Sequence, residues 1–270
     1  MPTVSVIIPT YNRKQYLMEL LTSLSMQTYQ DFEVVIVNDA GERVEDVAAL
    51  FPDLDISIIH QPVNQKHVVA RNTGVVHAAG EFIMFCDDDD LLVPAHMERM
   101  LAEIEGYDFV YSDVEIVTYE VENGLRVPKD RFVFAYEYDE QEMRKFSTFV
   151  PSGSLYRKHI HDTIGPLDAE MKHYWDWDFF LRASAAFRVK RMPACGVLYS
   201  FSEGGQHQSN QFDSMRVHLD KLCAKHNLGV LPTKNFFLLL EEPEVKKRRA
   251  PSEVLWDGTI FWREGPLAMK

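Results

Sequence analysis

Four consecutive aspartates, Asp87–Asp90, are the residues whose type and spacing point most directly to chemistry. Adjacent carboxylates raise one another's pKa and oppose folding unless a positive charge lies among them. Their oxygens suit hard cations such as Mg²⁺ and Mn²⁺, which usually bridge to substrate phosphates. A solvated acidic turn is the alternative. Because the aspartates directly follow the apolar segment Phe82–Phe85, a candidate buried strand, we favour a divalent-cation site.

A second acidic segment, Trp175-Asp176-Trp177-Asp178, precedes an apolar helical stretch. Either aspartate is able to cap the N-terminus of that helix, and for a lone aspartate capping is the default. The two tryptophans also create a surface on which a sugar ring stacks beside a carboxylate acting as a base. The residues alone favour capping, and both interpretations stay open at this point.

Four other side chains have both an ordinary and a functional interpretation. Asp39 either makes a turn or hydrogen-bonds a nucleotide base or ribose. Tyr11 either packs in the ordinary way or stacks on a base. Arg71 is either a surface arginine or a phosphate partner. His207, in a glycine-containing segment before a helix, is either inert or completes a metal or pyrophosphate site. The position of each side chain in the fold is needed to distinguish its two interpretations.

The elements that position these residues alternate between strand and helix over the first 110 or so residues. Strands are predicted at Val4–Ile8, Phe32–Val37, Ile56–Ile59, Phe82–Phe85 and Phe109–Ser112. Helices are predicted from a cap at Asn12 to Leu24, and at Val44–Phe51, His67–Ala79 and Pro94–Glu105. This alternation predicts a mostly parallel sheet with helices on both faces. Right-handed crossovers then bring the carboxyl ends of the strands to one edge, where ligands bind.

After residue 113 the pattern changes. Asn123-Gly124 between two β-prone segments is a strong hairpin signal. Helices are predicted at Asp178–Phe187 and Ser209–His226. From residue 231 the chain carries an apolar stretch, the basic cluster Lys246–Arg249 and an aromatic tail, and it predicts no clear element.

In combination and in this order, the motifs resemble those of family 2 glycosyltransferases of the GT-A fold. The matching segments are Val4–Arg13, Phe32–Asp39, Ala70–Gly74, Ala79–Ile83, Phe85–Asp90, Gly153–Arg157, Gly165–Asp168 and Asp176–Arg182. They cover about residues 3–210. Asp87 and Asp89 stand at the two acidic positions of the DXD-type metal motif. One departure is Trp175, where the family often has Glu before the catalytic aspartate.

The resemblance implies an α/β nucleotide-diphospho-sugar transferase fold with a Rossmann-like N-terminal half. It implies inverting transfer of a hexosyl or N-acetylhexosaminyl group from a nucleotide diphosphate sugar, with UDP favoured, to a carbohydrate, glycolipid or glycopeptide hydroxyl. We then expect residues 1–113 to bind the donor and 114–230 to bind the acceptor, with 231–270 an extension of unknown role.

The same resemblance assigns roles to individual residues. The expected donor-binding residues are Pro9, Thr10, Tyr11, Asn12, Arg13, Asp39, Arg71, Asp87 and Asp88. The expected ligands of Mn²⁺ or Mg²⁺ are Asp89 and Asp87, with His207 as a third candidate. Asp176 is the expected catalytic base, which raises this interpretation above helix capping.

Charge and hydropathy indicate whether nucleic acids and membranes are expected partners. The formal net charge of −13 disfavours nucleic-acid binding, which depends on basic surface. No apolar run reaches the ~18 residues of a membrane-spanning helix, and no signal-peptide pattern is present, so we expect a cytoplasmic protein. Lys246–Arg249 leaves open a contact with the inner face of a membrane, although a solvated tail is favoured. Oligomeric state stays open.

Two other functions remain as alternatives. A nucleotidyltransferase usually carries a glycine-rich basic loop after its first strand, and here that position holds Pro9–Arg13. A non-catalytic nucleotide-sugar binding module would bind a nucleotide with metal but would neither hydrolyse nor transfer the sugar.

Overall fold

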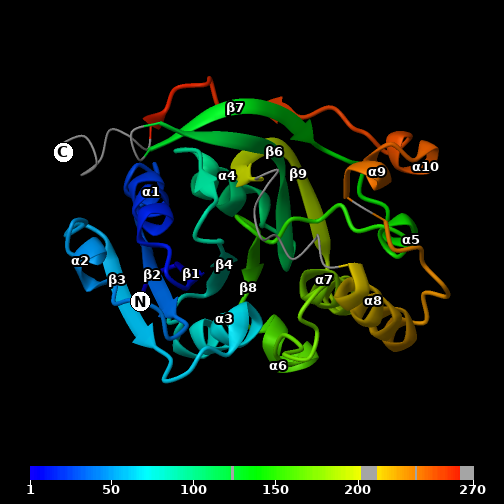
Figure 1. The fold of residues 1–270 in the computed structure, drawn as a ribbon, viewed down its shortest axis with the longest axis horizontal. Helices are drawn as coiled ribbons and strands as arrows, with labels where there is room; N and C mark the ends of the chain where they lie inside the picture. Colours follow the sequence, from blue (N-terminus) through cyan, green and yellow to red (C-terminus); the bar gives the residue numbers. More distant parts are fainter. Residues whose placement is uncertain (123–124, 202–211, 235, 262–270) are drawn as a thin grey trace.

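The fold was analysed in a computed structural model, which describes residues 1–122, 125–201, 212–234 and 236–261. It is built on a ten-stranded mixed sheet with the order β10-β9-β6-β8-β4-β1-β2-β3, in which β5 pairs with β9 and β7 with β6 (Figure 1). The strands are β1 (Val4–Thr10), β2 (Phe32–Asn38), β3 (Asp55–His60), β4 (Phe82–Phe85), β5 (Leu91–Leu92), β6 (Phe109–Glu122), β7 (Leu125–Phe134), β8 (Leu155–Arg157), β9 (Val189–Ser200) and β10 (Glu253–Val254). This confirms the predicted α/β architecture built on one central sheet.

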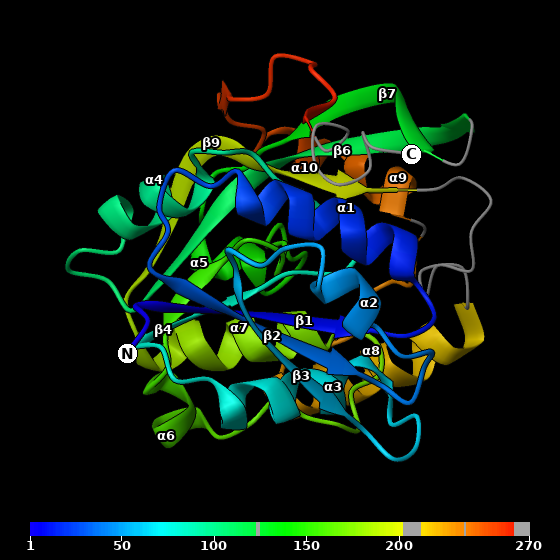
Figure 2. The same ribbon diagram turned by 90° about the vertical axis from the view of Figure 1, so that its left-hand side faces the viewer.

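Helices cover both faces of the sheet. They are α1 (Lys14–Ser25), α2 (Glu45–Ala48), α3 (Lys66–His77), α4 (His96–Glu103), α5 (Glu140–Met143), α6 (Ile160–Ile164), α7 (Trp175–Ala186), α8 (Phe212–His226), α9 (Phe236–Leu240) and α10 (Pro243–Lys246). Figure 2 shows α1 on one face, with α3 and α7 on the other. Strands β1, β2 and β4 are buried because both of their faces pack against helices.

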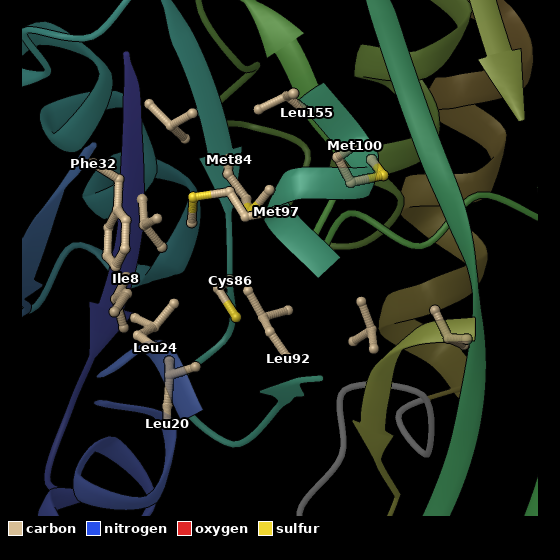
Figure 3. Close-up of a cluster of buried hydrophobic side chains, with 14 of the residues drawn as sticks. Ile8, Leu20, Leu24, Phe32, Met84, Cys86, Leu92, Met97, Met100 and Leu155 are labelled. Atoms are coloured by element: carbon tan, nitrogen blue, oxygen red, sulfur yellow. The ribbon is translucent and has the colours of Figure 1, made fainter. Parts of the chain in front are cut away.

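The N-terminal half follows the prediction closely. Strands β4, β1, β2 and β3 are parallel neighbours, so their carboxyl ends share one edge. On one face, Ile8 of β1 and Met84 of β4 pack with Leu20 and Leu24 of α1 (Figure 3). On the other face α3 lies so close to β1 that a Cβ atom at Gly74 would lie 2.3 Å from Cγ2 of Ile7. Glycine at this position allows the close approach.

The second half extends the same sheet in a way that the sequence did not predict. The short strand β8 lies antiparallel between β4 and β6, so β4 and β6 run in the same direction. Strand β6 does not stop at Ser112 but continues as a single strand to Glu122, with register shifts against β9 near Asp113. Strands β6 and β7 then form the predicted hairpin.

Two helix starts differ from the predictions. Asn12 does not cap α1, because it has a positive φ of 56° and its Oδ1 instead accepts a hydrogen bond from the Glu42 amide. Helix α7 begins at Trp175, after Tyr174 with a φ of 60°. Asp176 and Asp178 therefore lie inside the first turn and a half of α7, and neither is its N-cap.

The described part of the C-terminal extension packs on the second half of the sheet. Strand β10 pairs with β9, and Trp256 is buried. The basic cluster is not an unpaired positive surface: Lys246 and Arg249 pair with Glu241, and Lys247 pairs with Glu244. Its fourth member, Arg248, is buried. Among the described helices, none has the length and apolar character needed to cross a bilayer.

Candidate active site

The aspartate loop lies at the carboxyl edge of the sheet, directly after β4. Asp87, Asp89 and Asp90 each present an oxygen within 4.8 Å of the others. Asp87 and Asp89 are half-buried, whereas Asp88 and Asp90 are only 5% and 1% exposed. Asp88 and Asp90 are thus buried more deeply than Asp87 and Asp89, although Asp90 still presents an oxygen to the cluster.

Asp87 is paired with a buried arginine. Arg71 of α3 is 2% exposed, and its Nη2 donates to Oδ1 of Asp87. Its guanidinium carbon lies 4.2 Å from the ring centroid of Trp175, at the start of α7. Arg71 is therefore not a surface arginine: it joins the aspartate loop to the helix that carries Asp176.

Asp88 faces inward, toward the loop that follows β1. It accepts hydrogen bonds from Oγ1 of Thr10 at 2.8 Å and from Nη1 of Arg13 at 3.2 Å. Arg13 also pairs with Asp89 at 2.7 Å. Burial, with the neighbouring charge of Asp89, raises the pKa of Asp88 to about 7. Through its hydrogen bonds with Thr10 and Arg13, Asp88 links the loop after β1 to the aspartate cluster.

Asp90 was not assigned a role from the sequence, and it anchors the loop. It accepts hydrogen bonds from Oγ of Ser152 and from the backbone amide of Ser200, the latter at 2.8 Å. Ser152 also accepts a hydrogen bond from the Asp87 amide at 3.1 Å. Burial raises the pKa of Asp90 well above its ordinary value.

The other predicted donor-binding residues lie around β1 and β2. Asp39 is 4% exposed, and its two carboxylate oxygens accept the backbone amides of Gln65 and Lys66 at 2.7 and 2.8 Å. Asp39 thus fixes the start of α3 at the site edge. Tyr11 is 47% exposed and able to contact a ligand, whereas Pro9 is buried within β1.

The two aspartates of α7 have opposite electrostatic environments. Asp176 is half-buried, and burial raises its pKa, with Arg71 and Asp87 among the charges that act on it. Asp178 is fully buried and accepts hydrogen bonds from Arg182 and His226. It also forms an ion pair with Lys225 at 2.8 Å. Burial opposes its ionisation, but these partners outweigh burial and lower its pKa to about 2. Asp178 is a buried structural anion, and Asp176 is the carboxylate suited to accept a proton.

The predicted ligand His207 lies outside the described residues. The donor set that is described consists of carboxylate oxygens, the chemistry that Mg²⁺ and Mn²⁺ prefer. Asp87 and Asp89 are balanced by one arginine contact each, Arg71 and Arg13, and both remain half-buried at the site. The residues present therefore fit a divalent cation.

The chain is similar in sequence to known glycosyltransferases. The family described as Glycosyl transferase family 2 matches residues 5–165. An uncharacterized glycosyltransferase of Bacillus subtilis, YwdF, is 54% identical over 256 residues, covering 94% of this chain and 96% of the relative.

Two solved structures are similar in fold. TarS 1–349 of S. aureus in complex with UDP-GlcNAc has a TM-score of 0.62 at 22% identity, covering 91% of this chain and 78% of that one. The mannosyltransferase PcManGT of Pyrobaculum calidifontis, in complex with GDP-Man and Mn²⁺, has a TM-score of 0.62 at 21% identity. It covers 86% of this chain, which spans only 66% of that neighbour.

Proposed function

This chain belongs to glycosyl transferase family 2, and we propose that it transfers a sugar with inversion from a nucleotide diphosphate sugar to an acceptor hydroxyl, with a divalent metal ion. The observation that carries the proposal is that the aspartate loop and the start of α7 lie close together at one edge of the sheet. Asp87 and Asp89 follow β4, and Arg71 connects Asp87 to Trp175 at the start of α7, next to Asp176.

The donor would bind over the loops after β1, β2 and β4. Thr10 and Tyr11 would contact the base and ribose, and Asp39 would do so either directly or through the backbone that it fixes. Uridine is favoured because TarS, a neighbour in fold, binds UDP-GlcNAc, although PcManGT binds GDP-Man. The sugar itself would be a hexosyl or N-acetylhexosaminyl group.

Asp87 and Asp89 would hold Mn²⁺ or Mg²⁺, which neutralises charge developing on a diphosphate leaving group. His207 remains a candidate third ligand, outside the described residues. Arg13 and Arg71 already pair with these carboxylates and would supply further positive charge beside the diphosphate. The arginines therefore limit repulsion between the acidic loop and an anionic donor.

Asp176 would act as the general base. As the acceptor oxygen attacks the anomeric carbon from the face opposite the diphosphate, the hydroxyl proton passes to Asp176, and the bond from the anomeric carbon to the diphosphate oxygen breaks. Burial raises the proton affinity of Asp176, which suits a group that must accept a proton. The acceptor would be a carbohydrate, glycolipid or glycopeptide hydroxyl.

The test is a donor screen followed by one substitution. Wild-type protein with Mn²⁺ is expected to hydrolyse one nucleotide sugar slowly and to transfer its sugar when an acceptor is supplied. Asp176→Asn is expected to bind the donor normally and lose about 10²–10⁴-fold in turnover. Asp162→Asn, at an exposed position on α6, is the matched control.

Near wild-type turnover in Asp176→Asn would remove that residue from the role. Donor binding with neither hydrolysis nor transfer across a broad acceptor panel would instead favour a non-catalytic binding module.

A further inference from the structure

Arg126 is a buried charged residue that the proposed function does not use. It lies on β7, and its side chain is 3% exposed. The guanidinium carbon lies 4.7 Å from the ring centroid of Tyr16 and 4.8 Å from that of Tyr119. Its Nε donates to the fully buried carboxylate of Glu19 on α1. Burying such a pair costs several kcal/mol per ion, so its presence is weak evidence for a role in stability.

The other end of the guanidinium contacts the aspartate loop. Nη1 of Arg126 donates to the backbone carbonyl of Asp89 at 2.6 Å and to Oγ of Ser200 at 3.2 Å. The Ser200 amide in turn donates to Asp90. One side chain from the β6–β7 hairpin thus links α1, the carboxyl end of β9 and the loop that carries the candidate metal ligands.

These contacts complete the anchoring of the loop. The Asp87 amide is held by Ser152, the Asp90 carboxylate by Ser152 and Ser200, and the Asp89 carbonyl by Arg126. The carboxylates of Asp87 and Asp89 are left half-buried beside Arg71 and Arg13. The backbone of the loop is therefore fixed, while the two candidate ligands face the site.

We propose that Arg126, oriented by Glu19, is a positioning residue that holds the aspartate loop in the geometry for metal binding. The functional part of this inference rests on the proposed function. Partners that orient metal ligands typically contribute about 10–100-fold to metal affinity. Lysine cannot replace arginine here, because a single ammonium does not reproduce the planar fork that reaches Glu19, Asp89 and Ser200 together.

The test measures Mn²⁺ binding by electron paramagnetic resonance, UDP binding with Mn²⁺ by calorimetry, and amide hydrogen exchange in the peptide covering residues 86–92. Arg126→Lys is expected to raise the Kd of Mn²⁺ by about 10–100-fold and to accelerate exchange in that peptide. Arg131→Lys is the matched control on β7, because its partners Glu115 and Trp256 lie outside the peptide covering residues 86–92. It is expected to change neither quantity.

Glu19→Gln, which removes the charge that orients Arg126, is expected to shift both quantities in the same direction by a smaller factor. If Arg126→Lys fails to fold, the double variant Glu19→Met/Arg126→Met removes both buried charges and serves the same test.

Folded variants with unchanged Kd and unchanged exchange would overturn the proposal, as would a loss of stability without a change in Kd. Faster exchange in Arg126→Lys together with no binding of Mn²⁺ or UDP by wild-type protein would support loop positioning and contradict the proposed function.

Discussion

Asp176 and Asp178 are two residues apart on one helix, and their surroundings give them opposite proton affinities. Asp178 is surrounded by cationic partners, whereas the amides of the first helical turn and Arg71 only partly offset the burial of Asp176. A carboxylate with a raised pKa is a better base than an ordinary aspartate, provided that it is ionised at the working pH. This contrast supports Asp176 over Asp178 as the base.

The pH dependence of kcat/KM follows from that assignment. Because Asp176 must be ionised, activity should fall as pH decreases through its raised pKa, so the acid limb should lie above the ordinary aspartate pKa of 3.8. Initial rates at saturating Mn²⁺ across acidic pH test this, with circular dichroism as a control for folding. An acid limb at or below 3.8 would contradict a desolvated base.

Residue types and order identified the residues of the candidate site, but they did not predict which of these side chains are buried and which anchor the loop. The sequence identified Asp87–Asp90 as a unit, yet Asp88 and Asp90 are buried more deeply than Asp87 and Asp89. Ser152 and Arg126 were missed because serines and arginines are common and their partners lie far away in the chain. Only the pairing of distant strands brings them to the loop.

At the scale of elements, the contact between α3 and β1 positions Arg71 against the aspartate loop. Replacing Gly74 with alanine would place a methyl group 2.3 Å from Ile7, a fully buried branched side chain. We expect Gly74→Ala to destabilise the fold by about 1–3 kcal/mol. In an exposed helix interior the same change stabilises the fold by roughly 0.5–1 kcal/mol. The sign of the change in the free energy of unfolding therefore shows whether α3 packs closely on β1.

Urea unfolding measures this effect. Val76→Ala, at a position of α3 that is 77% exposed, is the control and should shift stability by less than about 0.5 kcal/mol. Greater stability in Gly74→Ala would show that α3 and β1 are not in this close contact.

The junction of α7 and α8 depends on Asp178, which contacts Arg182 of α7 and both Lys225 and His226 of α8. Its folded-state pKa of about 2 lies below the ordinary 3.8, so ionised Asp178 stabilises the fold above that ordinary value. The difference corresponds to about 2 kcal/mol. Asp178→Asn should lose about this amount at pH 7.

The gap between wild type and Asp178→Asn should shrink as pH falls from about 4 toward 2, where wild-type Asp178 becomes protonated. Urea unfolding at a series of pH values tests this, with Asp53→Asn, at an exposed position, as control. A gap that does not depend on pH would indicate a packing effect rather than charge.

For the whole molecule, the sequence predicted the parallel half of the sheet and its carboxyl edge correctly. It did not predict how the second half of the sheet joins the first, because β8 has only three residues, too few to show an alternation of apolar and polar side chains. The insertion of β8 beside β4 determines where β6 and β9 lie. Consequently Ser200, at the end of β9, lies beside Asp90 of the aspartate loop although the two are 110 residues apart in the chain.

We propose that this carboxyl edge of the sheet is a metal-dependent site for a nucleotide diphosphate. Calorimetric titration with UDP, GDP, CDP and dTDP, each with Mn²⁺ and again with EDTA, tests it most directly. We predict that one nucleotide, with UDP favoured, binds in the presence of Mn²⁺ and that EDTA abolishes this binding. If no nucleotide binds in the presence of metal, the proposed donor site is wrong, and the aspartate loop is a structural feature of an inactive relative.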